Sequence, residues 1–150
     1  MQTVRQLLKS KGDRQHASYA LSPDDTVMDA LKLMRDQNIG AVMITERDML
    51  VGIFSERDYT RRGAVTGTAC EDKPLRDYMT PKVFFIHPDK TIDDCMFLMT
   101  AKHIRHLPVM EDQQLIGMIT MRDAVKALIS EKENQIRELE SYITGNYGVY

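Results

Sequence analysis

The stretch Gly117-Met118-Ile119-Thr120-Met121-Arg122-Asp123 repeats the pattern of Gly52-Ile53-Phe54-Ser55-Glu56-Arg57-Asp58. Each copy has a glycine, two apolar residues, a hydroxyl residue, one further residue, an arginine and an aspartate. The copies begin 65 residues apart (117 − 52). Each copy predicts a short strand that runs into the start of a helix. Two copies with a period longer than a solenoid unit predict a paired module and not an open array.

The same offset of 65 residues extends well beyond these two stretches, without a gap. Identical residues at this offset are Pro23/Pro88, Thr26/Thr91, Leu33/Leu98, Met34/Met99, Ile39/Ile104, Leu50/Leu115, Gly52/Gly117, Arg57/Arg122 and Asp58/Asp123. The chain is therefore a tandem repeat, and each half predicts the structure of the other.

The composition of the 150 residues is that of an ordinary globular protein, with 43% hydrophobic and 28% charged residues and a net charge of −2. This charge gives no general attraction to nucleic acid or to an anionic membrane, so neither partner is predicted. No apolar run approaches the ~20 residues of a membrane-spanning helix. The first residues lack the apolar core of a signal peptide, and we expect a cytoplasmic location.

Cysteines and histidines predict neither a disulfide nor a metal site. Two cysteines, Cys70 and Cys95, suit a reducing compartment. They do not form a zinc pattern, and His16, His87 and His103 share no metal-ligand spacing.

Apolar periodicity and capping signals predict an α/β (α+β) fold made of two βαββα units and a long C-terminal helix. Two helices should start at the capping boxes Thr26-x-x-Asp29 and Thr91-x-x-Asp94. The predicted elements are helices at 3–11, 26–38, 55–62, 74–79, from 91, and 122–143, and strands at 19–21, 41–45, 50–54, 83–86, 107–110 and 115–119. The predicted domains are a first unit at 3–63, a linker at 64–73, a second unit at 74–130, and a helical extension and tail at 131–150. A polar connector is expected at 12–17.

The last helix carries an apolar edge. Ile129, Ile136 and Ile143 are seven residues apart, with Leu139 between them. Two heptads are too few to establish a coiled coil. Two interpretations stay open: the edge packs on its own domain, or it forms a dimer contact.

Three further stretches carry a resemblance to a known family: Met79-Thr80-Pro81, His87-Pro88-Asp89-Lys90-Thr91 and His106-Leu107-Pro108-Val109. With the two aspartate-terminated motifs, they make residues 3 to 130 resemble a pair of CBS domains, the domain named for cystathionine β-synthase. The first unit departs from the pattern. Leu8-Lys9-Ser10 stands in place of Met79-Thr80-Pro81, the connector that follows is six residues longer, and Met43 replaces the usual proline.

This resemblance implies that the units pack as a pseudo-twofold pair, a Bateman module. It also implies adenosyl ligands in two clefts between the units, and dimers of such pairs.

The residues of the repeated motif suit a nucleotide without reference to the family. A strand that turns into a helix exposes backbone N–H groups, and Ser55 and Thr120 add hydroxyl groups there. Arg57 and Arg122 could bind phosphate oxygens, and Asp58 and Asp123 could accept the ribose hydroxyls. Apolar strand residues that could enclose a purine are Ile53, Met118, Val42 and Ile86. The alternative is that Ser/Thr-x-x-Asp serves only as a helix cap.

By resemblance, the aspartate of one unit works with the first strand of the other. Asp123 would join Tyr19, Ala20 and Leu21, and Asp58 would join Phe85 and Ile86. Arg105 and His106 would point toward the phosphate region, whereas their counterparts, Gly40 and Ala41, carry no charge. The two sites are therefore predicted to differ in affinity or ligand.

The favoured function is a non-enzymatic regulatory module that binds an adenine nucleotide and signals to an unidentified protein in trans. The resemblance also implies that the chain forms a homodimer. AMP is the favoured ligand, and ADP, ATP, NAD(H) and S-adenosylmethionine are alternatives. An enzyme acting on an adenylated compound is disfavoured, because no nucleophile–base pair, Walker loop or GxGxxG motif is present. A nucleic-acid binder is disfavoured by charge, and a ligand-free interaction scaffold remains an alternative.

Overall fold

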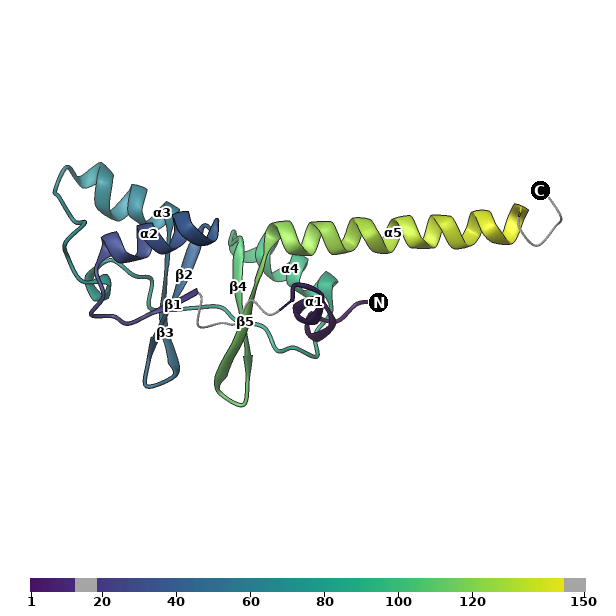
Figure 1. The fold of residues 1–150 in the computed structure, drawn as a ribbon, viewed down its shortest axis with the longest axis horizontal. Helices are drawn as coiled ribbons and strands as arrows, with labels where there is room; N and C mark the ends of the chain where they lie inside the picture. Colours follow the sequence, from purple (N-terminus) through teal and green to yellow (C-terminus); the bar gives the residue numbers. More distant parts are fainter. Residues whose placement is uncertain (13–18, 145–150) are drawn as a thin grey trace.

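The computed structural model describes residues 1–12 and 19–144, and most of the connector predicted at 12–17 lies outside these residues. Two similar halves lie side by side, and a long helix extends away from one of them (Figure 1). The elements are α1 (Val4–Ser10), β1 (Ala20–Leu21), α2 (Val27–Gln37), β2 (Ala41–Glu46), β3 (Met49–Ser55), α3 (Glu56–Asp58), η2 (Tyr59–Gly63), η3 (Ala64–Thr66), η4 (Leu75–Asp77), α4 (Ile92–Lys102), β4 (His106–Glu111), β5 (Gln114–Thr120) and α5 (Met121–Thr144).

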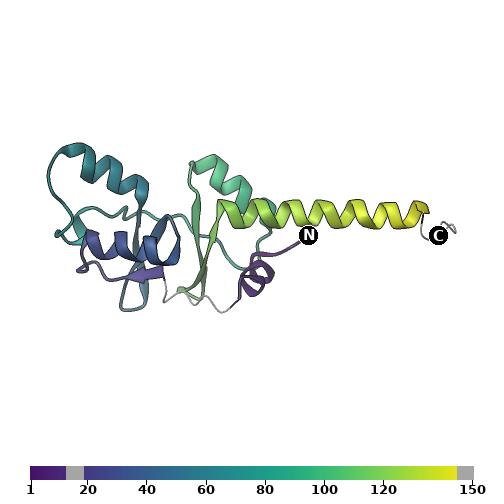
Figure 2. The same ribbon diagram turned by 45° about the horizontal axis from the view of Figure 1, so that its top comes forward.

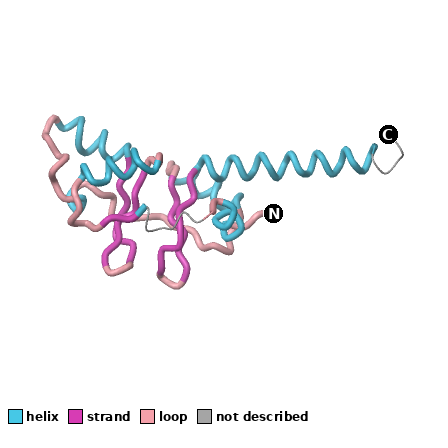
Figure 3. The backbone as a smooth tube through the Cα atoms, in the orientation of Figure 1, coloured by secondary structure: helices cyan, strands magenta, loops and turns pink. Residues whose placement is uncertain are grey.

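The predicted hairpins are confirmed, and both have the same register. Antiparallel β2 and β3 pair Ala41 with Ser55, and β4 and β5 pair the equivalent residues His106 and Thr120. Each hairpin turns through two residues with positive φ, for example Arg47 and Asp48 at 53° and 63°. Such turns match the twist of the strands they join. Figure 3 shows the two hairpins next to each other in magenta.

The predicted capping boxes also form. Thr26 Oγ1 accepts a hydrogen bond from the Asp29 amide at 3.1 Å, and the Asp29 carboxylate accepts one from the Thr26 amide at 3.0 Å. The Thr91 and Asp94 pair does the same at 3.2 and 2.9 Å. Bonding to the backbone amide of the capping threonine lowers the pKa of each aspartate, which keeps it charged beside the helix start.

The strand predicted at 83–86 is wrong. Only Ile86 forms a bridge, to Val109 of β4, and residues 83–85 are irregular. Phe84 and Phe85 remain 45% and 57% exposed. Strand preference reflects packing on a half-buried sheet, and residues 83–85 do not pair with a neighbouring strand.

The helix predicted at 55–62 does not end at Gly63. It passes through the π-helical η2 into the 3-10 helix η3, so the predicted linker 64–73 starts as helix. A Cβ on Gly63 would lie 2.6 Å from the sulfur of Cys70, which explains the need for glycine there. Cys70 itself is buried in the core of the first half.

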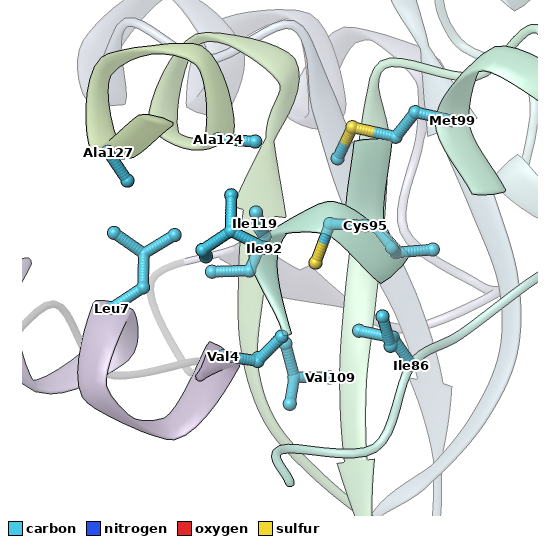
Figure 4. Close-up of a cluster of buried hydrophobic side chains, with 11 residues drawn as sticks. Val4, Leu7, Ile86, Ile92, Cys95, Met99, Val109, Ile119, Ala124 and Ala127 are labelled. Atoms are coloured by element: carbon cyan, nitrogen blue, oxygen red, sulfur yellow. The ribbon is translucent and has the colours of Figure 1, made fainter. Parts of the chain in front are cut away.

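The short helices that precede each half are exchanged between the halves. The sequence places residues 3–11 next to the first unit, whereas α1 buries Val4 and Leu7 in the core of the second half (Figure 4). Residues 74–79 directly precede the second unit in the sequence, whereas Leu75 of η4 is buried in the core of the first half. Equivalent bridges, Thr3 to Thr91 and Thr26 to Pro74, fix the two exchanged segments.

A third cluster of buried side chains joins the halves. It contains Tyr19, Met43, Leu115 and Met118, all at most 4% exposed. Because both hairpins contribute to it, the halves are held by an apolar contact and not only by the chain that links them.

The predicted C-terminal helix is confirmed as α5, which extends away from the body in both ribbon views (Figures 1 and 2). Its apolar edge does not pack on its own domain, because Ile129, Ile136, Leu139 and Ile143 are 53–60% exposed. Within residues 1–12 and 19–144, no helix is both long enough and apolar enough to cross a membrane.

Candidate functional site

A cleft of about 1090 Å³ lies between the two halves, and we call it the Asp58 cleft. One wall comes from the end of β3 and the helix that follows, and the other comes from the segment before α4, the end of α4 and the start of β4. Predicted site residues that line it are Ile53, Ser55, Arg57, Asp58, Gly40, Arg105 and His106. The fold thus brings the first copy of the motif, which ends at Asp58, into one cleft with Arg105 and His106, about 50 residues later in the chain.

Asp58 is held in a fixed position inside this cleft. Its Oδ2 accepts hydrogen bonds from the Ser55 amide at 3.0 Å and from Ser55 Oγ at 3.1 Å. Its Oδ1 accepts one from Thr80 Oγ1 at 3.1 Å. The capping interpretation is therefore correct for Oδ2. It does not exclude a ligand, because each carboxylate oxygen can accept more than one hydrogen bond.

The lining of the cleft is strongly cationic. It includes five side chains that are always cationic near neutral pH, against the two carboxylates Glu56 and Asp58. The five are Arg57, Arg61, Lys82, Lys102 and Arg105. Cations that converge in a cleft concentrate anionic ligands there, so the site suits phosphate.

Two of the cationic lining residues, Arg57 and Lys102, make contacts within the cleft. Arg57 donates a hydrogen bond to the main-chain oxygen of His103 at 3.3 Å, which links the two walls. The Lys102 ammonium lies 5.0 Å from the centre of the Phe84 ring. This cation–π contact places an exposed aromatic face on the cleft wall.

His106 lies against Gly40, and both residues line the Asp58 cleft. A Cβ on Gly40 would be 3.1 Å from the imidazole atoms Cε1 and Nε2. Burial lowers the pKa of His106, and the Arg105 charge lowers it further, while Asp123 raises it. The folded protein therefore favours the neutral imidazole.

This lowered pKa predicts a pH dependence of stability between about pH 8 and pH 5.5. On acidification, the unfolded chain takes up the proton near its usual pKa of about 6.5, before the folded chain does, so the free energy of unfolding should fall. Urea denaturation at the two pH values measures the change, and His106→Gln should reduce it. The exposed His87→Gln variant is the control. An unchanged dependence in His106→Gln would contradict the assignment.

The equivalent aspartate of the second half has different partners. Asp123 Oδ2 accepts hydrogen bonds from the Thr120 amide at 2.9 Å and from the Lys11 ammonium at 2.6 Å. Burial favours a higher pKa for Asp123, but the bonds from Lys11 and Thr120 outweigh it, so the pKa is lowered. Arg122 is exposed to solvent. The structure therefore does not give the two motifs the same surroundings.

Other predicted site residues lie away from the Asp58 cleft. Val42 and Ile86 are buried in the cores of the two halves and are not part of the lining of the Asp58 cleft. Phe85 is exposed, and Val83 and Phe84 line the cleft in place of Phe85 and Ile86. Ala20, Leu21, Ala41, Tyr19 and Met118 belong to the strands and to the contact between the halves. The buried hydroxyl of Tyr19 has no hydrogen-bond partner among the described residues.

Thr80, Lys82, Phe84 and Lys102 also line the cleft, and sequence reasoning gave them no role. The Met79-Thr80-Pro81 stretch was a family signal, but nothing in one sequence showed that Thr80 reaches Asp58.

The fold and the cleft define a class of protein: a tandem α/β module with a cationic cleft between its halves. The sequence model of the CBS domain matches residues 16–64 and 75–130, and the chain belongs to the CBS-domain family. It is similar to the CBS domain-containing protein CBSX3, mitochondrial, of Arabidopsis thaliana, with 36% identity over 97% of this chain and 73% of that protein.

Solved structures agree with this assignment. A putative signal-transduction protein with CBS domains from Burkholderia ambifaria is 39% identical, with a TM-score of 0.80 over 85% of this chain and 94% of that one. The structure of CBSX2 in complex with AMP is 23% identical, with a TM-score of 0.70 over 88% of this chain and 99% of that one. The second likeness shows the fold alone.

Proposed function

We propose that this chain is a non-enzymatic regulatory module that binds an adenine nucleotide in the Asp58 cleft. The observation that carries the proposal is the meeting of a fixed carboxylate with five cationic side chains in one cleft between two halves. The carboxylate suits ribose hydroxyls, and the cations suit phosphate oxygens. The complex of CBSX2 with AMP supports an adenosine ligand.

The proposed orientation follows from where these groups lie. Asp58 binds the ribose, and Ile53 and Phe84 supply apolar surface for the base. Arg57, Lys82 and Arg105 bind the phosphates. This charge favours AMP, ADP, ATP or NAD(H) over S-adenosylmethionine, whose sulfonium is a cation. AMP is the ligand that we propose first.

The position of α5 supports a route by which binding could reach a partner. Met121, its first residue, lines the cleft, and its amide donates a hydrogen bond to the Arg105 oxygen at 2.8 Å. A ligand that binds Arg105 therefore acts directly on the start of a helix that extends away from the body. Coupling requires that the ligand bind one arrangement of the halves more tightly than the other.

A second copy of this chain is the occupant that we propose for the apolar edge of α5. The spacing of Ile129, Ile136 and Ile143, with Leu139 between, is self-complementary. Isoleucine at this repeated position, with Leu139 at one intermediate position and Lys132 at the other, suits a short pair of parallel helices. Helix α5 would then line the cleft at its first residue, Met121, and form the dimer contact farther along.

The test of nucleotide binding is a thermal-shift screen of AMP, ADP, ATP, NAD, NADH and S-adenosylmethionine. A ligand at about 100 times its Kd should stabilise the protein by about 2.7 kcal/mol. Asp58→Asn should weaken binding by about 10- to 100-fold, because it removes a charged acceptor while an amide oxygen can still cap the helix. Asp123→Asn is the matched control and should keep the shift. No shift with any of the six ligands would favour the ligand-free scaffold.

A further inference from the structure

We propose that Lys11 occupies the place in the second half where a ribose would meet Asp123, so that the chain binds one nucleotide, at Asp58. The inference rests on the proposed function and assigns Lys11 as the residue that determines the number of sites.

The segments before the two halves pack on the motif glycines in the same way. A Cβ on Gly52 would lie 2.6 Å from the sulfur of Met79, and a Cβ on Gly117 would lie 2.7 Å from Cδ2 of Leu8. Met79 and Leu8 are therefore structural counterparts, 71 residues apart (79 − 8). The same offset makes Lys82 the counterpart of Lys11.

Beyond these counterparts the two halves differ. In the first half, Thr80 donates its amide to the Ile53 oxygen at 2.8 Å and its hydroxyl to Asp58 at 3.1 Å. In the second half, the Lys11 ammonium donates both to the Met118 oxygen at 2.8 Å and to Asp123 at 2.6 Å. Met118 and Asp123 are the repeat counterparts of Ile53 and Asp58. Lys11, a cation, thus donates to both acceptors in the second half, whereas Thr80, a neutral residue, donates to the equivalent acceptors in the first half.

This difference decides which carboxylate can accept a ligand. Thr80 gives Asp58 a neutral hydrogen-bond donor, and the one ion pair of Asp58 among the described residues is long, with Arg62 Nε 3.9 Å from Oδ1. Lys82 stays on the cleft wall. The Lys11 and Asp123 side chains are only 17% and 23% exposed, so their pairing is shielded from solvent. A ribose hydroxyl would have to replace a charge-assisted bond with a weaker one and leave the ammonium without its counter-charge.

The residues that could bind a phosphate also favour the Asp58 site over the Asp123 site. Arg105 and His106 line the Asp58 cleft, whereas the repeat counterparts Gly40 and Ala41 bring no cation to the second half. Both the ribose and the phosphate positions of the second half are therefore less suited to a nucleotide.

Isothermal titration calorimetry of the full chain with AMP tests the inference. Wild-type protein should bind one AMP per chain. Lys11→Met keeps the aliphatic stem but removes the charge, and it should bind two. Lys9→Met, on the same helix, is the matched control and should bind one. Lys11→Gln is a second variant in case Lys11→Met does not fold, and circular dichroism checks both.

The double variant Lys11→Met/Asp58→Asn separates this inference from the proposed function. It should bind one AMP, now at Asp123, while Asp58→Asn alone should show at least a tenfold loss of affinity. Two AMP per wild-type chain, or one per chain in both Lys11 variants, would overturn the inference and leave the Asp58 site standing. If AMP bound neither wild type nor any Lys11 variant, both the inference and the proposed AMP site would be wrong.

Discussion

Phe54→Ala is expected to lower the free energy of unfolding by about 3–5 kcal/mol, the usual cost of removing a buried phenylalanine ring. Phe54 is 0% exposed and lies in the core of the first half with Val27, Ala30 and Leu75. The core therefore receives side chains from α2, β3 and η4, and a cavity at its centre would affect all three elements. A loss of this size is a large share of the roughly 5–15 kcal/mol that stabilises a typical domain.

Urea denaturation of the wild type and variant measures this loss. Phe97→Ala is the matched control, because Phe97 is 75% exposed on α4 and its removal should change stability by no more than about 0.5 kcal/mol. Phe54 directly precedes Ser55 in the repeated motif, so the variant should also bind AMP less tightly. Equal losses for Phe54→Ala and Phe97→Ala would show that this cluster is not the stabilising core.

Ile136→Glu is expected to convert a dimer into a monomer and so halve the molar mass in solution. Ile136 is the central isoleucine of the α5 edge and is 57% exposed in the single chain. A carboxylate at the centre of an apolar helix pair would have to be buried without a partner, which is strongly unfavourable. The pairing surface is only about two heptads long, so we expect the dimer to depend on protein concentration.

Sedimentation over a range of protein concentrations measures the mass. Asn134→Glu adds the same charge on another face of α5 and should leave the dimer intact. A wild-type chain that sediments as a monomer at every concentration would refute the α5 contact, as would an Ile136→Glu variant that remains a dimer. Neither result would bear on nucleotide binding at Asp58.

Much of the fold could be predicted from sequence, because its signals act between close neighbours. The capping boxes at Thr26 and Thr91 join residues three apart, and the hairpins need only alternating apolar residues and a short turn. Because the sequence repeats, the elements of the repeated unit could be predicted from both copies. The family resemblance rested on the same local stretches, and the match of the CBS sequence model bears it out.

The errors occurred where a local signal competed with packing. The residues at 83–86 have strong strand preference, but only Ile86 finds a partner on β4. Val42 and Ile86 were apolar strand residues, and sequence alone could not tell a side chain in the core from one on a cleft wall. In both cases packing within a half decided the outcome, because Ile86 lies in the core of the second half and Val42 in the core of the first.

By itself, the sequence determined the two repeated units, their helix caps and hairpins, and the motif that ends at Asp58 and at Asp123. Only the tertiary structure decided that α1 and η4 pack on opposite halves, that Arg105 and Lys82 join Asp58 in one cleft, and that Lys11 reaches Asp123. Lys11 and Asp123 are 112 residues apart in the chain, and no local rule relates them. Hydrogen bonds within a few residues follow from backbone geometry, whereas contacts across the chain depend on how complete surfaces fit together.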